Sequence, residues 1–398
     1  MTYDHILSLS QQLCSRLISW RRDFHRHPEL GYREMRTAAI VAEHLERLGL
    51  EIITQVGGTG VVGLLRGERE GPTIALRADM DALPIQDRKE AEYSSRNAGV
   101  AHLCGHDAHT SMLMGAAELL TGLGKPQKGN IKFIFQPAEE GLAGAKAMME
   151  DGVLEHPRVD AIAGIHVFPG LSTGSLGVAK GVAFASADSI EIDIIGKGGH
   201  AARPHEAVDA IAVSAQVITA LQNIPSRMID PLETSVITIG RIEGGYMGAA
   251  IAPDVKMTGT VRTLSPAVRE QMPQLIEQVV RGVTEAFGAE YKLNYIKSYP
   301  AVINDEAMVE RVTEASDLLF ADKRWSYIKP STGGEDFAFY AEAVPGAFFR
   351  LGTGNDEERT RYPLHHPQFD LDESAMPYGV AMLSAVALHY LSGSGHTS

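Results

Sequence analysis

The first part of the chain alternates between helical and strand-like hydrophobic patterns. Apolar residues recur at helical spacing over residues 6–24 and predict an amphipathic first helix that ends before Pro28. A second helical pattern, over residues 37–49, ends on glycine, a residue typical of helix C-termini. Short strand-like runs follow, and helices and strands then alternate up to about residue 167. This alternation predicts βαβ units and a mostly parallel sheet with helices on its faces.

The pattern changes near Ser186. Residues 189–199, "SIEIDIIGKGG", alternate apolar and polar positions, as a sheet with one buried face does. The order β-α-β-β-α-β that follows is typical of a small α+β domain of the split-βαβ, ferredoxin-like type. After Ala301 helices and strands return. We therefore predict an α/β domain, formed by residues 1–185 and 298–398, that is interrupted by an inserted α+β domain at residues 186–297.

Length, composition and charge narrow the class of protein. A chain of 398 residues with 44% hydrophobic and 22% charged residues is expected to be globular, with two domains. The formal net charge of −14 disfavours nucleic acid or an anionic membrane as partner. No apolar run is long enough to span a membrane, and the N-terminal residues lack a signal-peptide pattern. Two cysteines cannot form a disulfide framework, so we expect a reducing environment and a cytoplasmic protein.

Residues with catalytic or ligating chemistry follow several of the predicted strands. The carboxyl ends of parallel strands meet at one edge of a sheet, where functional groups collect. We therefore expect the following side chains to converge there: Asp79 and Asp81 after "TIALRAD", Glu139 and Glu140 after "IKFIFQPA", His166 in "VDAIAGIHV", and His365 and His366 beside Pro367. The stretch "AHLCGHDAHT", residues 101–110, adds a thiol and three imidazoles.

Each of these residues also permits an ordinary structural interpretation. Cys104 is a candidate metal ligand. A cysteine at this position could equally be a small buried apolar residue or the nucleophile of a Cys–His pair. Adjacent glutamates are usually a solvated surface pair, and a single histidine after a strand usually has a structural role. Because all these groups follow strand-like runs, their joint occurrence favours one site. The sequence favours a thiolate ligand at Cys104.

The pair Glu139–Glu140 indicates the type of chemistry. Consecutive side chains beyond a strand end can point in different directions, so that one glutamate binds a metal and the other faces an attacking water. Metal-assisted hydrolysis needs this division, since the cation lowers the pKa of water and a carboxylate moves the proton. Cysteine and histidine suit zinc, and added carboxylates are compatible with manganese.

Seven motifs, in order and nearly from end to end, resemble the M20 peptidase family, in particular its aminoacylase and hippurate hydrolase-like amidohydrolase branch. These motifs are "RRDFHRHPELGYRE" (21–34), "LRADMDALPIQ" (76–86), "HLCGHDAHTSMLMGAA" (102–117), "FQPAEEGLAGAKAMMEDG" (135–152), "GKGGHAARPH" (196–205), "GGEDFAFY" (333–340) and "LHHPQFDLDE" (364–373). The resemblance implies that the α/β part is a metallohydrolase catalytic domain.

The resemblance also implies a binuclear site with two divalent ions per subunit, Mn²⁺ or Zn²⁺, with Ni²⁺ or Co²⁺ as further options. The implied ligands are Cys104, His106, Glu140, His166 and His365, with His366 as the alternative to His365. Glu139 is the implied general base. Asp81 is the implied orienting group for a ligand or for that base. His102 and His109 belong to the same motif and are expected to have structural roles.

The inserted segment resembles the lid and dimerisation domain of this branch and implies a homodimer or a higher oligomer. His200 is the implied donor to the oxyanion of the tetrahedral intermediate and a substrate-binding residue, and Arg203 and His205 are candidates for the substrate carboxylate. Two departures bear on specificity. Ala250 stands where relatives often carry asparagine, and Gly333, with the glycine after it, replaces a residue that is often serine and leaves more room for substrate.

These features together predict a metal-dependent amidohydrolase that cleaves N-acyl-L-amino acids, such as acetyl, benzoyl or indole-acetyl conjugates. A dipeptidase or carboxypeptidase with the same metals is the first alternative. A non-catalytic dimeric binding protein with this fold and a Cys-nucleophile amidase are the others. The intact Glu139 and the complete set of implied ligands argue against the binding protein.

Overall fold

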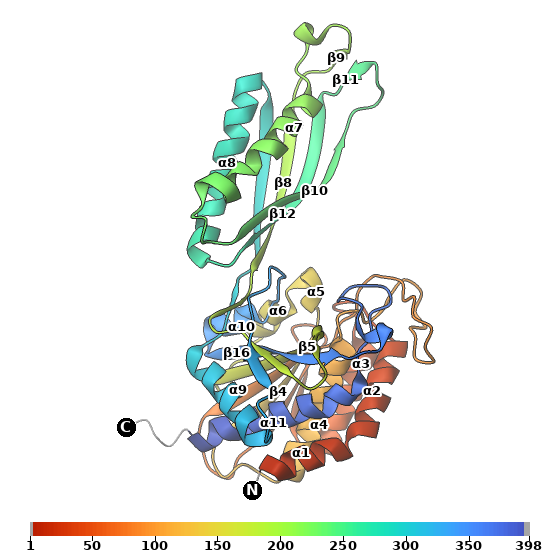
Figure 1. The fold of residues 1–398 in the computed structure, drawn as a ribbon, viewed down its shortest axis with the longest axis vertical. Coiled ribbons are helices and arrows are strands. Elements are labelled where there is room, and N and C mark those ends of the chain that lie inside the picture. The colour runs from red at the N-terminus through yellow and green to blue at the C-terminus, as the bar shows by residue number, and fades with distance from the viewer. Residues whose placement is uncertain (1–2, 394–398) are drawn as a thin grey trace. The chain divides into compact units, whose positions relative to one another are not determined.

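The computed structural model describes residues 3–393, which form two compact units (Figure 1). The first unit consists of the chain up to Ala183, Ile303–Lys329, and the chain from Asp336 onward. The second consists of Phe184–Val302 and Pro330–Glu335. The second unit thus begins two residues before and ends five residues after the predicted range of 186–297, and it takes in a short separate segment.

An eight-stranded sheet with the order β1-β2-β4-β3-β5-β16-β6-β15 forms the centre of the first unit. The central neighbours β4, β3, β5 and β16 are parallel, as is β15 to β6, whereas β1–β2, β2–β4 and β6–β16 are antiparallel. The predicted mostly parallel sheet is therefore confirmed, with antiparallel pairs outside its centre. Its strands are β1 (Glu51–Val56), β2 (Gly60–Arg66), β3 (Thr73–Asp79), β4 (Asn130–Gln136), β5 (Ala161–Ser172), β6 (Leu176–Val178), β15 (Trp325–Tyr327) and β16 (Gly346–Gly354).

Helices cover both faces of this sheet. Gly60 and Gly63 of β2 face opposite sides, and a Cβ atom added to them would meet Met148 of α6 and Leu45 of α3, respectively. α4, which contacts β3, β4 and β5, is buried along most of its length. The helices of this unit are α1 (Tyr3–Gln12), α2 (Cys14–Arg26), α3 (Met35–Arg47), α4 (His106–Gly122), α5 (Glu139–Leu142), α6 (Gly144–Glu150), α9 (Glu306–Leu319), α10 (Ala338–Ala343) and α11 (Met376–Gly393), with short 3₁₀ turns at Glu358–Thr360 and Glu373–Ala375.

The single first helix that the sequence predicts is two helices in the structure. α1 ends at Gln12 and α2 begins at Cys14. The last turn of α1 is tightened, because the Leu13 N–H donates to the Ser10 carbonyl, three residues back, and the Ser10 hydroxyl donates to the Leu7 carbonyl. The apolar spacing continues across this break, so hydrophobic periodicity alone does not reveal it.

The second unit has the predicted β-α-β-β-α-β order. Its antiparallel sheet has the strand order β10-β12-β8-β13, the arrangement of a ferredoxin-like fold. Along β8, Ile190, Ile192 and Ile194 are fully buried and alternate with more exposed residues, as the sequence pattern predicts. The elements are β8 (Ser186–Ile195), β9 (Gly199–His200), a 3₁₀ turn (Pro204–Glu206), α7 (Ala210–Leu221), a π-helical turn (Ile224–Met228), β10 (Ser235–Gly244), β11 (Ala250–Ile251), β12 (Asp254–Thr263), α8 (Pro266–Phe287) and β13 (Glu290–Tyr299).

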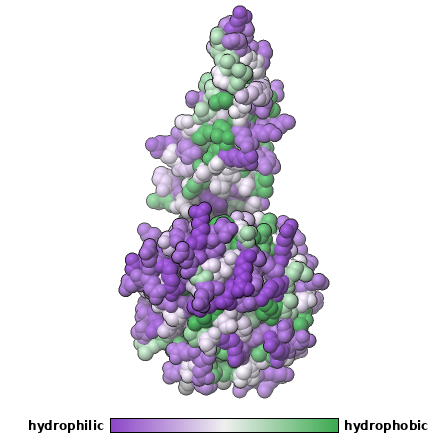
Figure 2. All heavy atoms as spheres, turned by 90° about the vertical axis from the view of Figure 1, so that its right-hand side faces the viewer, coloured by the Kyte–Doolittle hydropathy of each residue, from purple (hydrophilic) through white to green (hydrophobic). Residues whose placement is uncertain are grey.

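Two further short strands, β7 (Val182–Phe184) and β14 (Val302–Ile303), lie where the chain passes between units. Among the helices of residues 3–393, none has the length and apolar character needed to cross a bilayer. Hydrophilic residues cover most of the first unit on the face shown in Figure 2, and hydrophobic residues form scattered groups between them. Such a mixture is ordinary for the surface of a globular protein.

Candidate metal centre and active site

The predicted site residues of the first unit come from segments that meet at one edge of the central sheet. β3 ends at Asp79, β4 ends three residues before Glu139, and both run parallel to each other. His166 lies inside β5 rather than after it, because this strand continues to Ser172. Cys104 precedes α4, whose first residue is His106.

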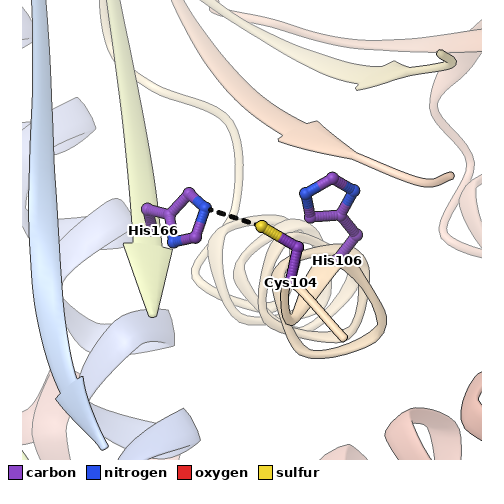
Figure 3. Close-up of side chains that lie close together, drawn as sticks. All are labelled: Cys104, His106 and His166. Carbon is purple, nitrogen blue, oxygen red and sulfur yellow. Dashed lines mark hydrogen bonds between the residues drawn. The ribbon is translucent and has the colours of Figure 1, made fainter. Parts of the chain in front are cut away.

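Cys104, His106 and His166 form a compact buried group (Figure 3). The Cys104 Sγ and one ring nitrogen of each histidine all lie within 4.8 Å of one another. Cys104 Sγ lies 3.5 Å from His166 Nε2. A sulfur and two imidazoles at this spacing can hold a divalent cation such as zinc.

Hydrogen bonds fix the orientation of both imidazole rings in this group. His166 Nδ1 donates to the Val167 carbonyl at 2.7 Å, which leaves the Nε2 lone pair facing Cys104. His106 Nδ1 lies 2.9 Å from the Asp81 carbonyl, so its Nε2 is also the free nitrogen. That buried His106 Nε2 has no hydrogen-bond partner among the residues that the structure describes. Both rings therefore present the nitrogen that a metal ion requires.

Glu140 and His365 form a second group with Cys104, whose ligand atoms again lie within 4.8 Å. Glu140 Oε1 is 3.3 Å from His365 Nε2 and 3.9 Å from His106 Nε2. His365 adopts a left-handed backbone conformation, with a φ of 66°. Its neighbour His366 stacks on Tyr362 and accepts the Gln368 N–H. The geometry thus groups His365, and not His366, with the other candidate ligands.

The turn after β4 carries the two adjacent glutamates. Ala138, just before them, has a left-handed backbone with a φ of 55°. Glu139 is buried, and its Oε1 lies 3.4 Å from the backbone nitrogen of Asp336. A carboxylate of Glu139 also belongs to a group with His106 and Glu140 within 4.8 Å. This places a second carboxylate beside the candidate ligands, where a general base is needed.

Asp81 contacts both a candidate histidine ligand and the turn that carries the two glutamates. Its Oδ1 is 3.2 Å from His106 Nδ1, and its Oδ2 accepts the backbone N–H of Glu140 at 3.0 Å. The side chain is almost completely buried. It therefore has the contacts expected of a residue that orients a ligand.

The two other histidines of the 101–110 stretch differ from each other. His109 Nδ1 is 2.6 Å from Asp79 Oδ1, and His109 Nε2 accepts the Val167 N–H at 2.9 Å, so both of its nitrogens are engaged. Neither ring nitrogen of buried His102 has a hydrogen-bond partner within the described part of the chain. Burial is the main cause that lowers the pKa of His102 to about 3, so this ring is neutral.

A buried charge network beneath the site was not identified from the sequence. Arg77 of β3 contacts Asp79 at 2.7 Å and Asp336 at 2.8 Å, and donates from Nε to the Gln136 amide oxygen. Asp336 also accepts from the Gln136 amide and from the Ala145 N–H. One signal was present, since an arginine within the apolar run "TIALRAD" must find a buried partner.

The electrostatic field of the site favours a cation. Burial lowers the pKa of His106, but Asp79, Asp81 and Glu140 outweigh it and raise this pKa to about 10. Burial, followed by Glu140 and Glu139, raises the pKa of the Cys104 thiol. For His166, burial and neighbouring imidazoles lower the pKa, which keeps the ring neutral. Neighbouring carboxylates thus contribute to the raised pKa values of both His106 and Cys104, whereas burial dominates at His166.

The predicted lid residues belong to the second unit. His200 lies on β9, pairs in register with Ala250 of β11, and accepts the Ala202 N–H through Nδ1. Arg203 is exposed, and one of its guanidinium nitrogens lies 3.6 Å from Glu206. Gly333, in the separate segment of this unit, donates its N–H to the Ser331 hydroxyl. All three of the predicted residues are exposed within the unit.

Divalent cations fit the residues of the first unit. The unpartnered His106 Nε2, the fixed ring orientations and the mixture of thiol, imidazole and carboxylate donors all suit such ions. Fold and donor set together define a metal-dependent hydrolase. The chain belongs to the peptidase family M20/M25/M40, whose sequence profile matches residues 75–389.

Proteins similar to this chain include several hydrolases. N-acetylcysteine deacetylase of Bacillus subtilis is 41% identical, with 91% of this chain and 93% of that protein covered. IAA-amino acid hydrolase ILR1-like 4 of Arabidopsis thaliana is 38% identical, with 94% and 86% covered. Thermostable carboxypeptidase 2 of Saccharolobus solfataricus is 38% identical, with 94% and 95% covered.

A solved structure extends this similarity to the fold. The B. subtilis protein YXEP, described as a dinuclear metal binding peptidase from the M20 family, superimposes with a TM-score of 0.83 at 36% identity. The match covers 96% of this chain and 99% of that one. The predicted family and fold class are thereby confirmed.

Replacing Cys104 by alanine should remove bound metal. The substitution deletes a sulfur shared by two groups of candidate ligands, so we expect a loss of affinity greater than the ~10–100-fold that outer-sphere changes cost. Metal content after dialysis, measured by elemental analysis, tests this. Cys14→Ala, at the only other cysteine, is the control and should retain metal. Full occupancy in Cys104→Ala would rule out a thiolate ligand.

Metal affinity should increase with pH. At neutral pH the raised pKa values keep protons on His106 and Cys104, and a cation must displace these protons. We therefore expect proton release on binding, and tighter binding at about pH 8 than at about pH 6. Titration calorimetry in two buffers of different ionisation enthalpy measures both effects. An affinity independent of pH would contradict the raised pKa values.

Proposed function

We propose that the protein hydrolyses the amide bond of N-acyl-L-amino acids and releases a carboxylate and a free amino acid. The observation that carries this proposal is that Glu139 and Glu140, although adjacent in sequence, have different surroundings. Glu140 groups with Cys104 and His365, whereas Glu139 is buried beside them. The similarity to an N-acetylcysteine deacetylase and to an IAA-amino acid hydrolase supports acetyl and indole-acetyl conjugates as candidate substrates, and benzoyl conjugates are a third candidate.

The proposed mechanism divides the work between the ligands and Glu139. Cys104, His106, Glu140, His166 and His365 would hold two divalent ions, Mn²⁺ or Zn²⁺, with Ni²⁺ or Co²⁺ also compatible. Such ions lower the pKa of water and polarise a carbonyl. Glu139 accepts a proton from the attacking water as the new C–O bond forms. It returns that proton to the nitrogen as the C–N bond breaks, and Asp81 holds His106 and the Glu140 turn in place.

Three residues of the second unit have proposed roles in catalysis and substrate binding. His200 donates a hydrogen bond to the oxyanion that forms at the acyl carbonyl. Arg203 is exposed and forms only a long ion pair with Glu206, and we assign it to binding of the substrate carboxylate. Gly333 is proposed to leave room for substrate at a separate position. Ala250 pairs with His200 across β9 and β11. Its side chain is a methyl group, so this position supplies no side-chain amide for substrate binding.

We also propose that the protein is a homodimer or a higher homo-oligomer formed through the second unit. β10 is an edge strand, with unpaired backbone groups on one side. Exposed apolar side chains on or near this strand include Leu232, Val236 and Ile242. An edge strand with apolar neighbours is suited to pairing with a second copy. A cytoplasmic location is proposed as well, since both cysteines are free.

A metallo-dipeptidase or carboxypeptidase that uses the same residues is the second candidate. Its support is the similarity to thermostable carboxypeptidase 2 of S. solfataricus. The two functions differ in the group joined to the nitrogen of the scissile amide. An amidohydrolase removes an acyl group without an amine, whereas a peptidase removes an aminoacyl or peptidyl group that has a free amine. Turnover of matched pairs, such as N-acetyl-leucine and glycyl-leucine, separates them, and faster cleavage of the peptide would favour the second function.

Replacing Glu139 by glutamine should abolish most turnover and leave metal binding intact. The amide keeps the shape of the side chain but cannot accept the proton, and general-base catalysis typically contributes ~10²–10⁴-fold. Hydrolysis of acetyl, benzoyl and indole-acetyl amino acids, measured beside metal content, tests this. Glu140→Gln is the matched comparison and should lose metal as well. A Glu139→Gln enzyme with near-normal rates would exclude Glu139 as the base.

Replacing His200 by alanine should lower kcat by ~10²–10³-fold, the usual cost of one oxyanion donor. The residue is exposed within its unit, so the fold should be unaffected. Steady-state kinetics with the preferred N-acyl amino acid provide the measurement. His389→Ala, at a histidine on α11 that pairs with Glu314, is the control and should leave kcat unchanged. A change confined to KM would place His200 in substrate binding alone.

A further inference from the structure

The motif at residues 21–34 provides no candidate ligand, yet its last residues lie against the turn that carries Glu139. Glu34 Oε1 accepts the Ala138 N–H at 2.8 Å, and the Tyr32 hydroxyl donates to the Leu142 carbonyl at 3.0 Å. The packing is close, since a Cβ atom added to Gly31 would come within 3.1 Å of Ala138 Cα. This segment therefore holds both ends of the short helix that follows β4.

The conformation of Ala138 is unfavourable in itself. Its φ of 55° and ψ of 44° lie in the left-handed region, which residues with a Cβ atom rarely adopt. Both of its backbone groups are fixed, because the N–H donates to Glu34 and the carbonyl accepts the Gly144 N–H at 3.0 Å. The next side chain in the sequence is that of Glu139. Its direction thus depends on the Ala138 backbone.

Glu34 is a hydrogen-bond acceptor whose position is fixed by its surroundings. The side chain is fully buried, and its second oxygen accepts the Thr59 hydroxyl at 2.5 Å. Burial is the main cause that raises the pKa of Glu34 to about 6. A buried carboxyl group is costly unless its hydrogen bonds are made, and both oxygens of Glu34 accept one.

Two other buried carboxylates hold later parts of the same turn. Asp81 accepts the Glu140 N–H at 3.0 Å, and Asp336 accepts the Ala145 N–H at 2.9 Å. Each of the three carboxylates comes from a different segment of the chain. Asp81 also contacts a candidate ligand, and Asp336 also contacts Arg77. Glu34 is the one whose bond lies immediately before Glu139.

We propose that Glu34 is a positioning residue that directs Glu139 toward the attacking water by holding Ala138 in its left-handed conformation. The proposal rests on the proposed role of Glu139 as general base. It assigns a function to the 29–34 segment that needs no contact between Glu34 and substrate or metal. The hydrogen bond from Ala138, and not the charge of Glu34, is the property that matters.

The test compares three variants at this bond. Glu34→Ala removes the acceptor. Glu34→Gln keeps an oxygen for the Ala138 N–H, and the Thr59 hydroxyl can turn to accept from the new amide. The double variant Glu34→Ala with Ala138→Gly removes the acceptor but introduces a residue that adopts positive φ without strain. Asp151→Ala, which deletes a 2.7 Å bond from the Gly57 N–H outside this turn, is the matched control.

We expect Glu34→Ala to reduce kcat per metal-loaded site by ~10²-fold, the size of effect that a small misplacement of a catalytic group produces. The KM value should change little. Glu34→Gln and the double variant should recover most of the loss, and Asp151→Ala should resemble the wild type. A purely structural role for Glu34 would not be rescued by glycine at position 138.

A second readout does not depend on activity. Hydrogen exchange of the 137–145 segment, measured on the full chain without added metal, should be faster in Glu34→Ala than in wild type, Glu34→Gln or Asp151→Ala. If Glu34→Ala does not fold, Thr59→Val, which removes one of the two bonds that fix Glu34, takes its place. Ala138→Gly should then reverse its smaller loss of kcat.

The outcomes separate this proposal from the proposed function. Unchanged kcat and exchange in Glu34→Ala, or equal impairment in Glu34→Gln, would overturn the positioning role while an inactive Glu139→Gln still supported the function. For Thr59→Val, unchanged kcat and exchange would overturn it in the same way. Wild-type protein that cleaves no N-acyl amino acid, or an active Glu139→Gln, would reject the function itself. The exchange data would in that case still decide whether Glu34 orders the turn.

Discussion

The site of the first unit depends on the carboxylate of Asp81, which joins two elements that are far apart in the sequence. One oxygen faces His106, the first residue of α4, and the other accepts the N–H of Glu140, in the turn after β4. A buried, charged acceptor makes strong hydrogen bonds, and losing one partner would leave the charge uncompensated. The position of the His106 imidazole is therefore coupled to that of the turn that carries Glu139 and Glu140. A metal site whose ligands come from several segments requires such coupling.

The sequence predicts the elements on which the site is built better than it predicts the contacts between them. Hydrophobic periodicity identified β3, β4 and β5, and the rule for parallel strand ends brought Asp81, Glu139 and His166 to one edge. β1 was missed because it is an edge strand with mostly exposed residues and no clear alternation. The partners of Arg77 were also missed, since one of them, Asp336, is 259 residues away in the sequence. No local pattern records such a contact.

The electrostatics argue against Cys104 as a nucleophile. A nucleophilic cysteine needs a lowered pKa and a neighbouring base, but here burial and two glutamates raise the pKa of the thiol. The adjacent His166 has a lowered pKa and would be a poor proton acceptor. A bound cation reverses this situation, because it stabilises a thiolate directly. The same surroundings that weaken a cysteine nucleophile therefore suit a cysteine ligand.

Charge balance also bears on the number of cations. Within the first unit, six acidic groups of the site, when deprotonated, carry six negative charges against one fixed positive charge, that of Arg77. The negative groups are Asp79, Asp81, Cys104, Glu139, Glu140 and Asp336. One divalent cation would leave three of the five excess negative charges, and two would leave a single one. Since uncompensated buried charge is costly, a site that keeps Glu139 unprotonated favours the pair of ions.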